Sequence, residues 1–164
     1  MKLTELWVLY DADKRIQGFS THTLNAYALQ LKMLIAGLGD LEIEAITLDL
    51  LKGYLSKQSD RLKPSSLGHR IRFVRSLFRF AFEEGHNSRN PALKLREPKT
   101  DKRIPIFLIE EDVILLKISC ESPREYAMLE FLYSTGCRVG EVQKLDIEDI
   151  NLENCSAIVN VFAA

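Results

Sequence analysis

The sequence is poor in the residues that build metal centres and thiol sites. It has three cysteines and three histidines in 164 residues. The cysteines, Cys120, Cys137 and Cys155, are odd in number and unclustered, without the spacing of a metal-ligand motif. No histidine follows Cys137 to act as a base, which argues against a cysteine nucleophile. We therefore predict free thiols in a reducing cytosol, no metal and no other cofactor.

Long apolar runs are absent as well. No stretch approaches the roughly 18 consecutive apolar residues that a membrane-spanning helix needs. The opening residues, MKLTELWVLYDADKR, are too charged for a secretory signal. We therefore expect a cytoplasmic protein with no membrane partner, and its 46% apolar content suffices for a buried core.

The net charge of −1 conceals a strong asymmetry along the chain. Residues 1–99 carry 16 Lys or Arg against 11 Asp or Glu, whereas residues 100–164 carry 6 against 12. The basic excess peaks over residues 52–79, where eight cations are accompanied by Asp60 as the single acid. This distribution predicts a portion that binds a polyanion, joined to a second portion of different character.

Helical periodicity dominates the first hundred residues. We predict four helices. The first covers 3–16, and the second runs from a Ser/Thr cap near Ser20 to Gly37 and Gly39. The third begins at Thr47 and faces Leu50, Leu51, Tyr54 and Leu55 inward, and the fourth runs from Pro64 to near Gly85. The proline-rich, basic stretch 90–105 predicts an interdomain linker. Beyond it we expect an extended segment at 106–109, a helix opening at Glu110–Asp112, helices over 124–133 and 138–145, and a strand over 155–162.

The helix over 66–84 has two distinct faces at 100° per residue. One arc is apolar: Leu67, Ile71, Val74, Leu77, Phe78, Ala81 and Phe82. A neighbouring arc holds Arg72, Arg75 and Arg79, of which Arg72 and Arg75 have no acidic residue at i±4. Arg70 falls among the apolar positions, from which we expect it to snorkel. A solvated face is the plain alternative. Since arginine suits phosphate and guanine edges, we favour DNA contact by Lys57, Arg61, Lys63, Ser65, Arg72, Arg75 and Arg79.

Arg138 and Glu141 stand three residues apart, just after the Thr135–Gly136 break. At that spacing the carboxylate can orient the guanidinium, while Val139, Val142 and Leu145 face a core. On these four residues alone, an ordinary intrahelical ion pair, worth a few tenths of a kcal/mol, is the preferred interpretation.

The wider stretch YSTGCRVGEVQKLDIEDINL resembles the first catalytic box of the tyrosine recombinase (phage integrase) family. The family pattern, roughly T-G-x-R-x-x-E-x-x-x-L-x-x-x-D-I, is matched by Thr135, Gly136, Arg138, Glu141, Leu145, Asp149 and Ile150. FSTHTLNAY and the 63–92 stretch that ends in N-P-A also resemble the family's N-terminal domain. The resemblance thus covers nearly the whole chain.

The resemblance implies a mainly α protein. It implies a four-helix SAM-like core-binding domain at 1–97, a linker at 98–105 and an α+β catalytic domain beginning at 106 and running to 164. It implies site-specific DNA recombination through a 3′-phosphotyrosyl link, with double-stranded DNA and other recombinase protomers as partners. Arg138 would be the first catalytic arginine, supported by Glu141, and Asp149 would be architectural.

The remaining catalytic residues of the family have no counterpart in the sequence. After Arg138 there is one lysine, Lys144 within the predicted helix, and no histidine, further arginine or tyrosine. The literal H-x-x-R at His69–Arg72 lies upstream, on the basic helix, and does not fit the catalytic order. We therefore expect a truncated recombinase, without its nucleophile, that binds duplex DNA but does not cleave it.

Two other functions remain open on the sequence. A non-catalytic DNA-binding regulator would use a helix-turn-helix over 127–145, although its second helix is acidic where groove entry favours basic or amide side chains. An all-helical interaction module is the third alternative, and both the arginine stripe and the recombinase pattern count against it.

Overall fold

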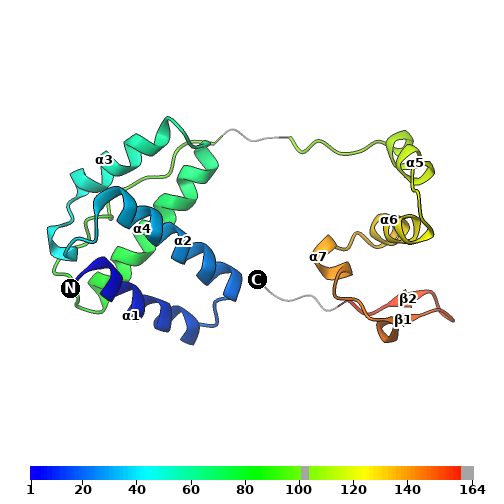
Figure 1. Cartoon of the computed structure of the whole chain (residues 1–164), viewed down its shortest axis with the longest axis horizontal. Coiled ribbons are helices and arrows are strands. Elements are labelled where there is room, and N and C mark those ends of the chain that lie inside the picture. The colour runs from blue at the N-terminus through cyan, green and yellow to red at the C-terminus, as the bar shows by residue number, and fades with distance from the viewer. Residues whose placement is uncertain (101–103, 160–164) are drawn as a thin grey trace. The chain divides into compact units, whose positions relative to one another are not determined.

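The chain divides into two compact units, Met1–Lys102 and Arg103–Ala164, in a computed structural model that describes residues 1–100 and 104–159 (Figure 1). The first unit contains α1 (Leu3–Ile16), α2 (Thr21–Leu38), the 3₁₀ turn η1 (Ile43–Ala45), α3 (Leu48–Ser59) and α4 (Pro64–Glu83). The second contains α5 (Glu110–Ile118), α6 (Pro123–Thr135), α7 (Val139–Val142), η2 (Ile147–Asp149), β1 (Ile150–Asn151) and β2 (Ser156–Ala157). The predicted mainly helical fold is confirmed. Within the described ranges, no helix has the length and apolarity to cross a membrane.

Local chemistry sets the starts of the first-unit helices. The hydroxyl of Ser20 accepts the Thr23 N–H, and Thr47 accepts the Leu50 N–H, each at 3.3 Å, as N-caps do. Pro64 opens α4 at a position where no N–H is needed. Of the two glycines predicted to end α2, Gly39 is confirmed as the C-cap, with a φ of 85°, whereas Gly37 lies inside the helix, which runs to Leu38.

α4 forms the centre of the first-unit core, with α1, α2 and α3 packed against it. Its buried face is rotated from the predicted arc toward Phe73 and Phe80, which meet the ring of Tyr10 at centroid distances of 6.4 and 5.5 Å. Phe82, predicted to be inside, is consequently 49% exposed, because α1 covers the other flank of the helix. Leu50 of α3 was likewise predicted inward and is exposed.

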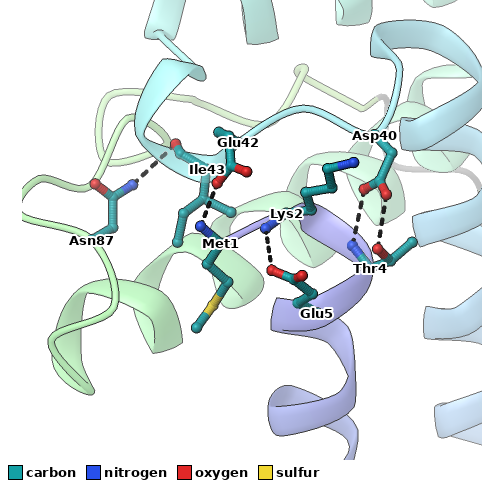
Figure 2. Close-up of polar contacts among 8 residues, drawn as sticks. All are labelled: Met1, Lys2, Thr4, Glu5, Asp40, Glu42, Ile43 and Asn87. Carbon is teal, nitrogen blue, oxygen red and sulfur yellow. Dashed lines mark hydrogen bonds and ion pairs between the residues drawn. The ribbon is translucent and has the colours of Figure 1, made fainter.

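Polar contacts tie the N-terminus of α1 to the loop that precedes α3 (Figure 2). The carboxylate of Asp40 accepts the backbone N–H and the hydroxyl of Thr4 at 3.1 and 2.8 Å, and the hydroxyl bond holds the pKa of Asp40 below its usual value. Asn87, a buried polar side chain, donates from Nδ2 to the carbonyl of Ile43 at 3.3 Å. These bonds position α1 and the segment after α4 around one loop.

The first part of the predicted linker belongs to the first unit. Pro91, Ala92 and Leu95 are buried, and Asn90 Oδ1 accepts the Ala92 N–H at 2.9 Å. The 90–96 stretch is therefore a packed turn and not a spacer, because its apolar residues cover the core. Residues 98–100 and 104–105 have no regular secondary structure, and 101–103 lie outside the described residues.

α5 and α6 are joined by a charged and aromatic contact. Glu130 accepts from Lys117 Nζ at 2.7 Å and from the Tyr126 hydroxyl at 3.2 Å, and Lys117 lies 4.7 Å from the ring centroid of Tyr133. The bond to Lys117 lowers the pKa of Glu130, and the reciprocal bond raises that of Lys117. Nonetheless no residue of the described 104–159 range is fully buried.

Several predicted elements of the second unit are shorter in the structure. The helix predicted over 138–145 is the four-residue α7, and Lys144 follows it in a turn. Val139, predicted to face a core, is 68% exposed. The predicted 155–162 strand is formed over Ser156–Ala157, paired with β1, and its positions 160–162 lie outside the described residues. Residues 106–109 form no strand.

Candidate nucleic-acid interface

A stripe of small and basic residues runs along α4. Ser65, Gly68, Arg72, Arg75 and Arg79 recur at intervals of three and four, which places them on one side of the helix. Arg72 and Arg79 are exposed and Arg75 is half-buried. Three guanidinium groups therefore project from one helix face of the first unit, as the sequence predicts.

Three further cations surround the start of α4. Lys57 lies in the last turn of α3, Arg61 in the connection, and Lys63 at the N-cap of α4. All three side chains are exposed. They extend the positive charge over the α3–α4 connection, beside a helix N-terminus whose dipole is also positive.

Glu97 lies against the arginine stripe, which the sequence analysis did not foresee. One carboxylate oxygen is 3.7 Å from Arg72 Nε and the other is 4.0 Å from Arg75 Nη1. A Cβ on Gly68 would be in ordinary van der Waals contact, at 3.4 Å, with the same side chain, so Glu97 packs closely on the helix at this position. Arg72 and Arg75 have no acidic residue at i±4 within α4, but the segment after the core supplies one, Glu97.

Arg70 does not snorkel. It is 8% exposed, with Nε 3.2 Å from Gln30 Oε1 and Nη1 2.7 Å from Gln58 Oε1. The two amides come from α2 and α3, so hydrogen bonds hold the guanidinium inside where the sequence alone indicated a route to solvent. Of the two arginines in the His69–Arg72 sequence, Arg70 is therefore buried in the first unit and Arg72 is on its surface.

The Thr135–Gly136 break is a helix end followed at once by a helix start. Gly136, with a φ of 66°, ends α6 in the left-handed conformation, and its N–H donates to the Leu132 carbonyl. The Thr135 hydroxyl accepts the Cys137 N–H at 3.3 Å. Arg138 is then extended, with φ −75° and ψ 147°, as the N-cap residue of α7. The break therefore fixes the backbone direction at Arg138.

Glu141 holds Arg138 by two bonds. Its Oε2 accepts the Arg138 backbone N–H at 2.8 Å, and its Oε1 accepts from Nη1 at 2.9 Å. These bonds, the backbone one first, lower the pKa of Glu141 and keep the carboxylate charged. The Arg138 side chain is 82% exposed, against 16% for Glu141. The guanidinium is thus oriented from behind and presents its other N–H groups outward.

Asp149, expected to be architectural, accepts the Asp146 N–H at 2.9 Å and so opens η2. The structure argues against the helix-turn-helix alternative, because α7 has four residues and is too short for a recognition helix in the major groove.

Comparison with known families places both units. Residues 14–85 match the family model described as the phage integrase N-terminal SAM-like domain, and residues 108–162 match that of the phage integrase family. The chain belongs to the phage integrase family of tyrosine recombinases. A tyrosine recombinase of Pseudothermotoga lettingae is 33% identical over 142 residues, covering 83% of this chain and 50% of that protein. XerC of Pelobacter propionicus is 36% identical over 146 residues, with coverages of 83% and 48%.

XerD of Haemophilus influenzae is 31% identical over 159 residues, covering 92% of the chain and 51% of XerD. The chain therefore spans about half the length of these relatives. Among solved structures, a lambda integrase dimer bound to a COC′ core site matches with a TM-score of 0.79 and 22% identity, covering 98% of this chain and 48% of that one. A lambda integrase tetramer bound to a Holliday junction gives 0.80 and 23%, with coverages of 93% and 46%. These likenesses establish the recombinase fold.

Proposed function

We propose that the chain binds duplex DNA as part of a site-specific recombinase. The DNA-binding residues are Lys57, Arg61, Lys63, Ser65, Arg72, Arg75 and Arg79. Arg138 is the first catalytic arginine, and Glu141 is its positioning residue. The core-binding domain spans 1–97 and the catalytic part begins at 106. The protein acts in the cytoplasm and beside other recombinase protomers. The dimer and the tetramer of lambda integrase on DNA support the second part of this proposal.

The geometry of Arg138 carries this proposal. An exposed arginine that a partly covered carboxylate holds at both its backbone and its side chain is ready to bind an anion. Its fork of N–H donors fits two oxygens of one phosphate. Strand transfer passes through a phosphorane whose negative charge grows in the transition state, and a fixed cation stabilises that charge where it develops. No metal or organic cofactor is needed for this step.

The test is equilibrium binding of the whole chain to a fluorescent duplex across a salt series. We expect affinity that falls steeply with salt, because phosphate contacts release counterions. Incubation with a nicked suicide substrate is expected to give no covalent protein–DNA adduct, since no tyrosine follows Arg138 in the 164 residues. Absence of duplex binding at low salt would refute the proposed function. A phosphotyrosyl adduct would show that a tyrosine of this chain is the nucleophile, against our expectation.

Replacing Glu97 with glutamine is expected to tighten duplex binding. The carboxylate now neutralises part of the charge of Arg72 and Arg75, and a surface ion pair of this kind is worth up to about 1 kcal/mol, or roughly fivefold in affinity. Glu44→Gln, an equal change of charge at an exposed position on η1, is the matched control. Equal gains in both variants would show that net charge, and not the contact with the stripe, sets the affinity.

A further inference from the structure

A pocket of about 300 Å³ opens between α2 and α4, next to the arginine stripe. Its lining consists of Ala26, Tyr27 and Gln30 from α2 and Ser66, His69 and Arg70 from α4. Ser66 lies in the first turn of a 20-residue helix, where the helix dipole favours negative charge. The lining contains no carboxylate. The polar groups of this pocket are thus suited to an anion.

Arg70 is the unusual member of this lining. A buried cation ordinarily has an anionic partner, because desolvating a charge is costly. Its hydrogen bonds, however, go to the neutral amides of Gln30 and Gln58 and it also interacts with the neutral Tyr54 hydroxyl, and among the described residues no carboxylate forms an ion pair with it. Its charge also opposes the rise that burial causes in the pKa of Tyr54. The guanidinium has five N–H donors, so the two amides leave donors for a ligand.

His69 adds a donor of defined orientation. Its Nδ1 is 3.0 Å from Arg72 Nη2. Since an arginine can only donate, Nδ1 accepts in this bond, and the ring proton is then on Nε2. The same bond links the pocket to the arginine stripe. Ser66, His69 and the buried Arg70 therefore contribute a hydroxyl, an imidazole and a guanidinium to the lining of one space beside the arginine stripe.

We propose that this α2–α4 pocket binds a single phosphoryl group of the duplex backbone, with Arg70 as its central cation. The proposal rests on the proposed DNA binding and adds a defined contact point to it. The exposed arginines of the stripe hold phosphates at a solvent-screened surface, whereas Arg70 binds from a site of low dielectric, where a charged hydrogen bond is stronger. One phosphate seated there fixes the position of the duplex along α4.

The first test compares two variants that each remove one positive charge. Arg70→Gln is expected to weaken duplex binding about tenfold at 0.1 M salt and to lower the log–log salt slope by about 1. Arg15→Gln, on α1 and paired with Asp11, is expected to leave both unchanged. Arg70→Lys keeps the charge and should retain the slope. Circular dichroism and the fluorescence of the single tryptophan, Trp7, monitor folding. An Arg70→Gln variant that folds and binds like the Arg15→Gln variant would overturn the proposal.

The second test uses the unaltered chain and so does not depend on how any variant folds. We expect the Arg70 Nε–H resonance to shift on adding duplex DNA and on adding inorganic phosphate, but not chloride of equal ionic strength. If duplex shifts the Arg72 signal while Arg70 responds to neither ligand, the pocket proposal fails and DNA binding stands. If the chain binds no duplex, the proposed function fails, and a phosphate-induced shift at Arg70 would then assign the pocket to a free phosphate.

Discussion

Replacing Arg72 and Arg75 together with alanine is expected to weaken duplex binding about 100-fold at 0.1 M salt, since each lost phosphate contact removes a factor of roughly ten. The log–log salt slope should fall by about 2. Both side chains project from the same face of α4, and their acidic partner Glu97 is held loosely, at 3.7 and 4.0 Å. A duplex phosphate carries the same single charge as that carboxylate but presents two oxygens that match the fork of a guanidinium, and its neighbours along the backbone add to the field.

A matched pair of substitutions separates position from net charge. Arg15→Ala with Lys32→Ala also removes two cations from the first unit, from the exposed surfaces of α1 and α2. This control is expected to change the affinity less than threefold, because screened charges without a phosphate partner contribute little. Fluorescence anisotropy over a salt series measures both variants. If the control weakens binding as much as the α4 variant, the stripe is not the contact surface.

The parts of the fold that depend on neighbouring residues could be predicted from the sequence. The caps at Ser20 and Thr47 and the start at Pro64 follow from side chains that bond to their own backbone within three residues. The family motif around Arg138 could be recognised for the same reason, because its residues lie close together in the sequence. The structure adds the two bonds from Glu141, which explain how that spacing orients the guanidinium.

What could not be predicted depends on contacts between distant segments. The buried position of Arg70 requires Gln30, 40 residues earlier, and no periodicity in α4 reveals that partner. Glu97 reaches the stripe because the packed 90–96 turn directs the chain back over α4. The rotation of the α4 core face toward Phe73 depends on the ring of Tyr10 in α1. A helical wheel specifies which residues share a face, but the packing partner decides which face is covered.

Gly37→Ala is expected to destabilise the first unit by about 1–3 kcal/mol, as overpacking of a filled core does. A Cβ at Gly37 would lie 2.5 Å from two carbons of the Tyr54 ring, a distance that requires the ring to move. Tyr54 is 4% exposed and has little room, and its hydroxyl adjoins the charge of Arg70. The close packing of α2 on α3 at this glycine therefore supports the buried arginine as well.

Gly53→Ala is the matched control for this substitution. Gly53 is also inside a helix, but a Cβ there would meet no atom within 4 Å. Alanine at such a site is expected to stabilise by about 0.5–1 kcal/mol, because it restricts the unfolded chain and favours the helix. The two glycines thus predict opposite signs for one chemical change. Urea unfolding followed by Trp7 fluorescence measures both, since the tryptophan packs against the first-unit core. A Gly37→Ala variant as stable as Gly53→Ala would show that α2 and α3 are not in close contact at Gly37. The packing of Tyr54 would then not support the buried position of Arg70.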